Sequence, residues 1–411
     1  MKNWELVHLR DVCNLINGRA YKKAELLHEG KYPVLRVGNF FSNRSWYYSD
    51  LELDDSKYCD DGDLLYAWSA SFGPRIWKGG KVIYHYHIWK TSLNLDKVDK
   101  KYLYYWFEWD TERIKAEQGV GTTMIHVTKE AMENRSLYLP AIPQQKRIVA
   151  ILDEAFEGID RALANTEKNL ANSRELFESY LNAMFTQKGD GWVEKKLKDL
   201  IDISHGYAFK GADFETSNDE EKLIVLTPGN YSENGELYFS SKNTKRLICG
   251  SPPCGYLFNV GDLTVVMTDL SSKMKILGKP AFVERPNILH NQRIGRILLK
   301  DESINSKYLF YFLRTGIFAN KIKETATGTM VRHTAPQRIL SNKIPIPKDF
   351  DEQVHITSKL DELATETQRL ETIYRQKITV LNELKQSILQ KAFTGELTAD
   401  TPKTVKEKIA A

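Results

Sequence analysis

The chain has 411 residues, enough for two or three domains, and its 42% hydrophobic residues can form packed cores. Charged residues make up 27% of the chain and balance to a net charge of +4, which excludes a strongly basic, histone-like nucleic-acid binder. The sequence begins without the apolar core of a signal peptide and contains no apolar run of about 18 residues. We therefore expect a soluble, cytoplasmic protein.

The first predicted domain spans residues 1–143 and mixes short strands, turns and a few helices. Apolar runs at residues 32–37, 63–68 and 81–84 are interrupted by Gly, Asn, Asp and Ser, which favours strands and turns. Residues 101–117 favour a helix. This pattern predicts an α+β domain.

Residues 144–188 predict one long helix, because the segment contains no proline and only one glycine, Gly158. Apolar or small residues recur in steps of three and four, with one additional four-residue step. This spacing is typical of a coiled-coil seam with a stutter. The seam residues expected to pack against a partner helix are Ile148, Leu152, Ile159, Leu170 and Phe177.

A second globular domain, residues 189–347, is followed by a second helix, residues 348–396, and a polar tail, residues 397–411. The second helix repeats the seam and its stutter. Lys385 interrupts the apolar pattern, and we expect the neighbouring Leu384 to cover that turn. The seam residues of this helix are Ile356, Leu360, Leu363, Leu370, Leu381 and Ile388.

The two halves of the chain repeat one another. The segment from Trp4 to Lys22 returns 188 positions later, so that Gly18 matches Gly206. A repeat of about 200 residues is too long for a solenoid unit and indicates a duplicated, domain-sized module. Further matches at offsets of 206 and 208 residues are Lys101-Tyr-Leu103 with Lys307-Tyr-Leu309, Gln145 with Gln353, Leu152-Asp-Glu154 with Leu360-Asp-Glu362, and Phe185-Thr186 with Phe393-Thr394.

The order of the segments limits how the helices can pair. The first domain leads into the first helix, and only a few residues separate the end of that helix from the second domain. If the helices pair, they must therefore run antiparallel, with one domain at each end and approximate two-fold symmetry. A helix of about 42 residues is about 60 Å long, so the pair would act as a ruler between the domains.

No catalytic motif is complete. Ser251-Pro-Pro-Cys254 is close to the signature of DNA amino-methyltransferases, but it has cysteine where an aromatic ring must stack on a flipped base. Gly278-Lys279 is followed by Pro280 instead of a hydroxyl residue, and His85 and His87, in a predicted strand, lack a third metal ligand. We predict no catalytic, cofactor or metal site. Four cysteines without zinc-site or disulfide spacing are expected to be packing residues: Cys13, Cys59, Cys249 and Cys254.

Basic residues and donor-rich loops occur at matching places in the two halves. Residues 75–101 and 269–296 are enriched in Lys and Arg, which favours phosphate contact. Nearby segments combine glycine, which permits close backbone approach, with side chains that donate to phosphates and bases. The candidate DNA-binding residues are Trp68, Ser69, Ser71, Arg75, His87, Thr122, Thr123 and His126 in the first domain, and Thr268, Ser271, Lys273, Lys275, Arg293, Thr329, Arg332 and His333 in the second.

The sequence resembles a known family over essentially its whole length. Leu139-Pro-Ala-Ile-Pro-Gln-Gln-Lys-Arg-Ile148, followed by Leu-Asp-Glu and a long helix, is similar to the specificity (S) subunits of type I restriction-modification enzymes. His290-Asn-Gln-Arg-Ile-Gly295 and the closing Lys391-Ala-Phe-Thr-Gly395 also resemble that family. The second copy, Ile344-Pro-Ile-Pro347 with Gln353, departs slightly in spacing.

The resemblance implies a non-catalytic DNA-recognition subunit. Two target-recognition domains would each read one half of a bipartite, asymmetric site in double-stranded DNA, and the helices would set the spacer. The implied partners are methyltransferase subunits, two of them, that use S-adenosylmethionine, and restriction subunits that use ATP and Mg. The chain itself would hold no cofactor.

Two other classes of protein remain open. A single-chain DNA methyltransferase with a degenerate motif at residues 251–254 would bind S-adenosylmethionine. A coiled-coil scaffold for two proteins would show no competition by duplex DNA at its basic faces.

Overall fold

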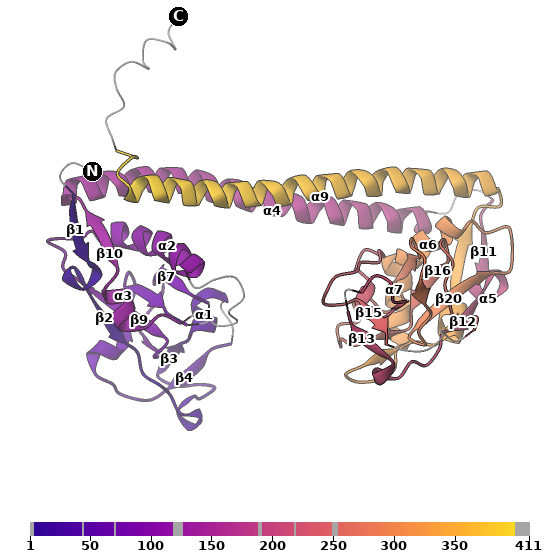
Figure 1. The fold of residues 1–411 in the computed structure, drawn as a ribbon, viewed down its shortest axis with the longest axis horizontal. Coiled ribbons are helices and arrows are strands. Elements are labelled where there is room, and N and C mark those ends of the chain that lie inside the picture. The colour runs from indigo at the N-terminus through magenta and orange to yellow at the C-terminus, as the bar shows by residue number, and fades with distance from the viewer. Residues whose placement is uncertain are drawn as a thin grey trace, which may run out of the picture. The chain divides into compact units, whose positions relative to one another are not determined.

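The structure is a computed structural model that describes residues 4–42, 45–69, 71–117, 126–187, 191–217, 219–248 and 254–398. It contains two compact units (Figure 1). Unit 1 consists of residues 1–167 and 376–411, and unit 2 consists of residues 168–375. Two long helices, α4 (Ile142–Thr186) and α9 (Phe350–Phe393), each contribute one part to each unit. Within the described ranges, no helix is both long and apolar enough to cross a membrane.

Unit 1 has the predicted α+β fold. An antiparallel sheet in the order β2-β9-β6-β7 carries α2 on one face, and a second sheet has the order β4-β3-β8-β5. Strands β1 and β10 form a separate antiparallel pair. The strands are β1 (Glu5–His8), β2 (Cys13–Asn17), β3 (Tyr32–Leu35), β4 (Tyr47–Ser49), β5 (Tyr58–Cys59), β6 (Leu64–Ala67), β7 (Gly73–Ile76), β8 (Val82–Tyr84), β9 (Ile88–Leu93) and β10 (Ser136–Leu139). The shorter helices are α1 (Val37–Ser42), α2 (Lys100–Glu117) and α3 (Lys129–Glu133).

Strand β6 is buried on both faces, which accounts for its continuous apolar sequence. Leu64 and Tyr66 belong to the core formed with α2, whereas Leu65 and Ala67 belong to the core of the second sheet. In unit 1, α2 lies between the sheets and the long helices (Figure 1). The core of unit 1 is therefore layered around one central strand.

Unit 2 repeats the main features of unit 1. Its antiparallel sheet β12-β20-β16-β18 corresponds to β2-β9-β6-β7, and the pair β11-β22 corresponds to β1-β10. A second sheet has the order β13-β15-β14-β19. The strands are β11 (Val193–Lys196), β12 (Ile201–His205), β13 (Phe214–Thr216), β14 (Ile224–Val225), β15 (Lys245–Leu247), β16 (Leu263–Val266), β17 (Thr268–Asp269), β18 (Pro280–Phe282), β19 (Ile288–Leu289), β20 (Ile294–Leu299), β21 (Arg332–His333) and β22 (Lys343–Ile346). The shorter helices are α5 (Leu197–Leu200), α6 (Ser306–Arg314), α7 (Gly316–Thr325) and α8 (Pro336–Leu340).

The long helices pack against each other in both units. In unit 1 the first part of α4 meets the last part of α9, where Nζ of Lys385 lies 3.4 Å from Oδ1 of Asp160. In unit 2 the last part of α4 meets the first part of α9, where Arg174 and Glu371 form an ion pair of 2.7 Å. The two helices therefore run antiparallel within each unit.

The seam residues predicted from the sequence are all buried or half-buried. The buried ones are Ile148, Leu152, Ile159, Phe177, Ile356 and Leu360, and the half-buried ones are Leu170, Leu363, Leu370, Leu381 and Ile388. The prediction at Lys385 was wrong. Leu384 is 46% exposed, whereas the ammonium group of Lys385 lies 4.8 Å from the ring centre of Phe156. A long lysine stem can pack in the seam while its charge stays at the edge.

A buried glutamine fixes the beginning of each long helix. Oε1 of Gln145 accepts a hydrogen bond from the amide of Asp99, and its Nε2 donates to the carbonyls of Lys97 and Pro140, at 2.7–2.8 Å. Gln353 makes the corresponding bonds in unit 2, with the amide of Asn305 and the carbonyls of Ser303 and Pro347. The repeated glutamines therefore join helix and domain.

The repeated Leu-Asp-Glu motif serves the same purpose. Asp153 accepts hydrogen bonds from Lys101 and from the hydroxyl of Tyr105, both at 2.7 Å. Asp361 accepts from Lys307 and the hydroxyl of Tyr311 at 2.8 and 2.7 Å. Many of the repeated residues thus attach a long helix to its domain.

The end of each long helix completes a core that begins in the other half of the sequence. Near the end of α9, Leu389 and Phe393 lie in the core of unit 1, where the Phe393 ring packs against Tyr102. At the end of α4, Phe185 lies in the core of unit 2 and packs against Tyr308. Each unit is therefore built from both sequence repeats.

Candidate nucleic-acid interface

Three backbone segments meet at one end of the central sheet in unit 1. The amide of Trp68, just after β6, donates to the carbonyl of His87 at 3.0 Å, and the amide of Val127 donates to the carbonyl of Trp68 at 3.4 Å. Ser69 and His126 form an antiparallel bridge. We call this meeting of residues 67–69, 85–88 and 126–127 the three-segment edge of unit 1.

Unit 2 contains the same edge. The amide of Met267 donates to the carbonyl of Arg293, and the amide of Thr334 donates to the carbonyl of Met267, both at 2.9 Å. Thr268 pairs with His333 where β17 meets β21. Residues 266–269, 291–294 and 332–334 therefore form the three-segment edge of unit 2. The candidate residues Trp68, Ser69, His87 and His126 thus lie together in unit 1, and Thr268, Arg293 and His333 lie together in unit 2.

The turn that enters each edge is held by a close backbone approach. In unit 1 the amide of Arg19 donates to the carbonyl of Tyr84, and a Cβ atom on Gly18 would lie 2.4 Å from the carbonyl oxygens of Tyr84 and His85. In unit 2 a Cβ atom on Gly206 would lie 2.3 Å from the carbonyl carbon of Asn291. Only glycine fits at these two positions, which explains why the repeat retains it.

Aromatic and imidazole rings form the edge of unit 1. The Trp68 ring lies 4.9 Å from His87, 6.1 Å from His126 and 5.8 Å from Trp89, against which it stacks. Its Nε1 donates to the carbonyl of Tyr86 at 2.8 Å. His85 and His87 were predicted in a strand, but they lie in the turn between β8 and β9.

Burial disfavours protonation of the imidazoles in this turn. It lowers the pKa of His85 to about 4, with further contributions from the nearby His87 and Arg36. The pKa of His87 is lowered by burial and then by His126. A neutral imidazole has one donor and one acceptor. Nδ1 of His85 accepts from the amide of His87 at 3.4 Å, which leaves its Nε2–H as a donor.

The edge of unit 2 carries different side chains. Thr268 is buried, and its hydroxyl lies 3.1 Å from Nδ1 of His333. Gln292 and Arg293 are exposed, and their side chains make no hydrogen bond or ion pair with any residue that the structure describes. Asn291 instead accepts from the amide of Arg293 at 3.0 Å. The turn therefore carries two exposed polar side chains, Gln292 and Arg293, that have no hydrogen-bond partner among the described residues.

Many of the basic residues already contact other residues of the chain, so fewer Lys and Arg side chains are available for DNA. In unit 1, Arg75 donates to the carbonyl of Phe40 and lies over the Phe40 and Phe41 rings. In unit 2, Lys275 pairs with Glu233 at 2.6 Å. Other basic residues bound in this way are Lys81, Lys90, Lys100 and Lys101 in unit 1 and Arg285 and Arg296 in unit 2.

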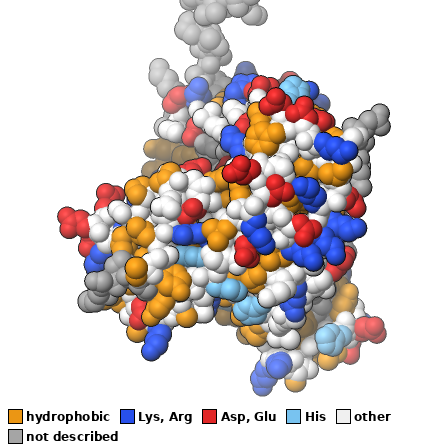
Figure 2. Space-filling model, turned by 90° about the vertical axis from the view of Figure 1, so that its right-hand side faces the viewer, with side chains coloured by type: hydrophobic (Ala, Val, Ile, Leu, Met, Phe, Trp, Pro, Cys, Tyr) orange, Lys and Arg blue, Asp and Glu red, His pale blue; other side chains and the backbone are white. Residues whose placement is uncertain are grey.

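A few Lys and Arg side chains of these two stretches have no hydrogen-bond, ion-pair or ring partner among the described residues: Lys78, Lys97, Lys273, Arg293 and the half-buried Lys279. Figure 2 shows a face on which Lys and Arg side chains are interspersed with Asp and Glu side chains and with histidines. The cations available for phosphate contact are therefore few, and this face is not uniformly basic.

The other predicted residues have mixed positions. Ser71 and Thr329 are exposed, whereas Ser271 lies in a turn in which its amide donates to Asp269. Arg332 is half-buried opposite Asp269, and its buried Nε has no partner within the described part of the chain. Thr122 and Thr123 lie outside the described residues.

The cysteine prediction held only in part. Cys13 and Cys59 are buried packing residues, and burial raises the pKa of Cys13 to about 12. Cys254, in contrast, is exposed. Cys249 and residues 251–253, and with them most of the degenerate methyltransferase motif, lie outside the described residues.

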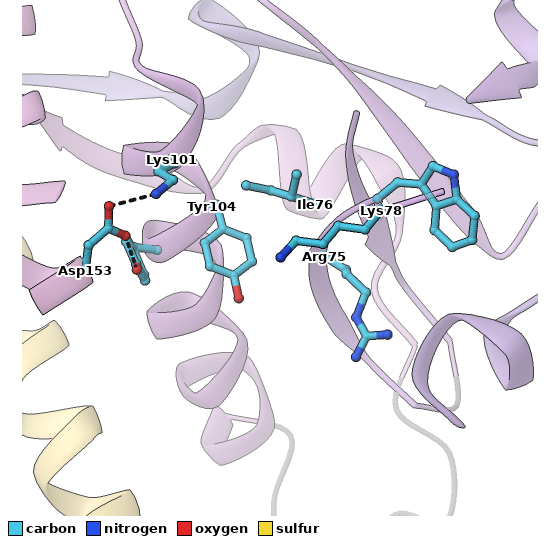
Figure 3. Close-up of a pocket in the computed structure, with 8 residues that line it drawn as sticks. Arg75, Ile76, Lys78, Lys101, Tyr104 and Asp153 are labelled. Carbon is cyan, nitrogen blue, oxygen red and sulfur yellow. Dashed lines mark hydrogen bonds and ion pairs between the residues drawn. The ribbon is translucent and has the colours of Figure 1, made fainter. Parts of the chain in front are cut away.

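A cavity of about 530 Å³ between α2 and β7 contains the acidic residue Asp153 among basic and aromatic ones (Figure 3). Lys78 extends toward Tyr104, whereas Lys101 is bonded to Asp153. Because Asp153 also accepts from Tyr105, its carboxylate attaches α4 to α2. Among the described residues, no group of three His, Cys, Asp or Glu side chains could hold a metal ion.

Sequence reasoning missed three residues beside the edges: Arg36, Tyr86 and Gln292. Arg36 lines a cavity of about 430 Å³ together with His85 and His87. The position of Arg36 could have been found from the sequence repeat. Leu35-Arg-Val-Gly-Asn39 in the first half corresponds to Leu226-Thr-Pro-Gly-Asn230 in the second, and a short helix begins in each segment.

The fold and its duplicated edge define a protein with two related recognition units. The model of the type I restriction modification DNA specificity domain matches residues 1–170 and 189–380, so both halves of the chain are covered. The chain belongs to this family.

Similar proteins span nearly the whole chain. The type I restriction enzyme MjaVIII specificity subunit of Methanocaldococcus jannaschii is 24% identical, with 96% of this chain and 93% of the relative covered. The EcoBI specificity subunit of Escherichia coli is also 24% identical, with 97% and 87% covered.

Two solved structures share the fold. A chain in a type I R-M system has a TM-score of 0.73 at 17% identity, covering 97% of this chain and 99% of that one. The HsdS subunit from Thermoanaerobacter tengcongensis has a TM-score of 0.51 at 17% identity, covering 97% and 98%.

Proposed function

We propose that this chain is the DNA-reading subunit of a type I restriction-modification complex and recognises a bipartite, asymmetric site. The observation that carries the proposal is the three-segment edge, which both units build with the same backbone bonds but with different side chains. Equal scaffolds with unequal side chains suit two half-sites of different sequence. The recognition domains would be residues 1–143 and 189–347, and the helical segments 144–188 and 348–396 would set the spacer.

The proposed partners follow from the same role. Two methyltransferase subunits would bring S-adenosylmethionine, and restriction subunits would bring ATP and Mg, while this chain supplies recognition in the cytoplasm. The long helices and the recognition units would form the platform on which those subunits assemble with duplex DNA.

The first test is the methylation pattern of host DNA with and without this chain, co-expressed with its methyltransferase partner. We expect methylation at a site in two parts separated by an unread spacer, with different sequences in the two parts. A continuous or palindromic site would contradict the proposal. Binding of S-adenosylmethionine by the chain alone would favour the single-chain methyltransferase, and basic faces that duplex DNA cannot occupy would favour the protein scaffold.

The second test distinguishes residues that recognise bases from residues that contact phosphates. His126→Ala should weaken discrimination at one half-site only, and His333→Ala at the other, because each imidazole belongs to one edge. Lys273→Ala should weaken binding to all sequences and lower the salt dependence by about one counterion, since a free cation contacts phosphate. Lys275→Ala is the matched control, because its ammonium group is paired with Glu233. The measurement is binding of the assembled methyltransferase to single-base variants at two salt concentrations. Equal losses at both half-sites for His126→Ala and His333→Ala would mean that these residues belong to the framework.

A further inference from the structure

We propose that unit 2 contains a binding site for a phosphate ester, in a cavity between the last part of α4, the segment before β18 and helix α7. The three side chains that would hold the ligand are Lys279, Arg314 and Lys323, which we call the cation cluster of unit 2. The inference goes beyond the proposed function and does not depend on it, because the cluster lies outside the three-segment edge.

The cavity has a volume of about 610 Å³ and lies within unit 2. Five cationic side chains line it, against two carboxylates. Two of these cations are neutralised, because Arg174 pairs with Glu371 at 2.7 Å and Lys275 pairs with Glu233 at 2.6 Å. The other carboxylate, Glu178, is exposed and forms no ion pair within the described part of the chain. The cavity therefore has an excess of positive charge.

The cation cluster is half-buried, and its side chains form no hydrogen bond or ion pair with any residue that the structure describes. Burial lowers the pKa of Lys279, and the charges of Arg314 and Lys323 lower it further, although Glu178 and Glu233 oppose the shift. A half-buried cation loses hydration, and neighbouring like charges repel each other. A bound anion would reduce both costs.

Aromatic rings, and not a carboxylate, hold Arg314. Its guanidinium carbon lies 5.2 Å from the ring centre of Phe177, 5.3 Å from that of Phe310 and 5.7 Å from that of Tyr311. Gly235 packs against the same side chain, since a Cβ atom there would lie 3.3 Å from Cδ of Arg314. These contacts position the guanidinium without using its N–H groups, so its donors stay available to a ligand.

The donors indicate a phosphate ester. A guanidinium group can bind two phosphate oxygens at once, and a lysine binds phosphate as a point charge. Three cations match a phosphate monoester, with a charge of about −2 near pH 7, better than a carboxylate with a single charge. The cavity volume is within the range of about 300–1,000 Å³ that is usual for small-molecule sites, so there is room for more than the phosphate group.

The scaffold that the two units share does not require these cations. The offset of 206 residues aligns Arg314 with Glu108, which accepts a hydrogen bond from the hydroxyl of Tyr104 at 2.7 Å. The pairing of β7 with β6 and of β18 with β16 aligns Lys279 with Gly73. Unit 1 thus has an acidic residue and a glycine where unit 2 has two cations. We therefore expect the site in unit 2 only.

The test uses the full chain and two probes, inorganic pyrophosphate and AMP. Titration calorimetry measures binding at constant ionic strength, with sodium chloride as the reference. We expect saturable binding of at least one probe. Hydrogen exchange should then slow in residues 233–236 and 275–279 of unit 2 and stay unchanged in unit 1.

Substitutions in the cluster test which residues bind the probe. Lys279→Gln, Arg314→Gln and Lys323→Gln should each weaken binding by about 10- to 150-fold, because each removes a charge-assisted hydrogen bond. The matched control is Lys321→Gln, which removes one charge from an exposed position of α7 that does not line the cavity. Thermal unfolding shows whether each variant is folded, and the two lysine variants suffice if Arg314→Gln is not.

The same variants distinguish a free phosphate ester from a phosphate of the DNA backbone. If DNA supplies the phosphate, Lys323→Gln in the assembled methyltransferase should weaken binding to all DNA sequences and lower the salt dependence by about one counterion. Duplex DNA should then compete with the probes. If the ester is free, affinity for DNA should be the same in the parent and in the variants.

Three results would overturn the inference. The first is no saturable binding of either probe together with unchanged affinity for DNA in the variants. The second is an equal loss in Lys321→Gln, or binding that sodium chloride reproduces, because either would show a non-specific charge effect. The third is weaker assembly with the methyltransferase in the variants while neither probe binds, which would assign the cluster to an acidic segment of a partner subunit. Each of these results leaves the proposed function standing.

Discussion

At the scale of single residues, the clearest constraint is the missing side chain at Gly18 and Gly206. Alanine at either position would place a methyl group within about 2.4 Å of neighbouring backbone, which forces the turn between β8 and β9, or the turn before β20, to move. We expect Gly18→Ala to lower the stability of unit 1, and Gly206→Ala that of unit 2, by about 2–4 kcal/mol. The control is Gly158→Ala in α4, where a Cβ atom meets nothing within 4 Å and the helix should gain about 0.5–1 kcal/mol. Hydrogen exchange of each unit measures the effect, and undisturbed turns in the first two variants would contradict the explanation.

A buried histidine should make unit 2 sensitive to acid. His290 is 2% exposed, and its Nε2 donates to the carbonyl of Ile294 at 2.8 Å. Burial lowers its pKa to about 4, below the ordinary value of 6.5, so the folded state binds fewer protons than the unfolded state between these values. Stability is then present above pH 6.5 and is lost as the pH falls toward 4, by about 2 kcal/mol between pH 7 and pH 5. His290→Gln should lose less stability over this interval, as measured by thermal unfolding. An equal loss in the variant would assign the effect to carboxylates.

Sequence reasoning placed the candidate site better than it ranked the residues in it. The candidates Trp68 and His126 lie at the edge of unit 1, and Thr268 and His333 lie at the edge of unit 2, because corresponding segments of a duplicated module meet at equivalent places. Availability could not be predicted, since the partner of Lys275 is Glu233, which lies 42 positions away in the sequence. Gln292 was not among the candidates, although it lies within His290-Asn-Gln-Arg-Ile-Gly295, which resembles the family.

At the scale of elements, the repeated glutamines identify where each long helix is fixed. Gln145→Ala would leave the amide of Asp99 and two carbonyls without partners, and should cost about 2–4 kcal/mol in unit 1. Gln353→Ala should do the same in unit 2. Gln144→Ala is the matched control, because that side chain makes one hydrogen bond, to Thr398, and its loss should cost about 1 kcal/mol. Hydrogen exchange of the Asp99 and Asn305 amides measures the change. Equal protection in all three variants would show that the glutamines do not anchor the helices.

The elements themselves differed in how well the sequence predicted them. Apolar residues recur at a helical period along the whole of each long helix, so their seam residues could be predicted one by one. Lys385 was misplaced because a period counts a lysine as polar, although its stem packs on Phe156. The short strands β14 and β19 have two residues each and depend on pairing with distant segments, so local sequence could not predict them.

At the scale of the whole molecule, α4 and α9 pass from one unit into the other, and we expect their length to set the spacer of the DNA site. Inserting four residues after position 167 in α4 and four after position 375 in α9 adds about one turn, or about 6 Å, to both helices. The spacer should lengthen by one or two base pairs at about 3.4 Å each, while both half-sites stay the same. Methylation mapping measures the spacer. An unchanged spacer in an active variant would show that the helices do not set it. The control is the same insertion in α4 alone, which puts the seams of the two helices out of phase.

The way in which the helix ends complete the cores also decides when each unit can fold on the ribosome. Unit 2 is one continuous stretch, residues 168–375, so a nascent chain contains all of it before synthesis reaches the end of α9. Unit 1 begins at the start of the sequence but can complete its fold only later, because its core needs Leu389 and Phe393. A chain cut short before Leu389 would therefore damage the unit at the start of the sequence and spare the unit nearer to the cut.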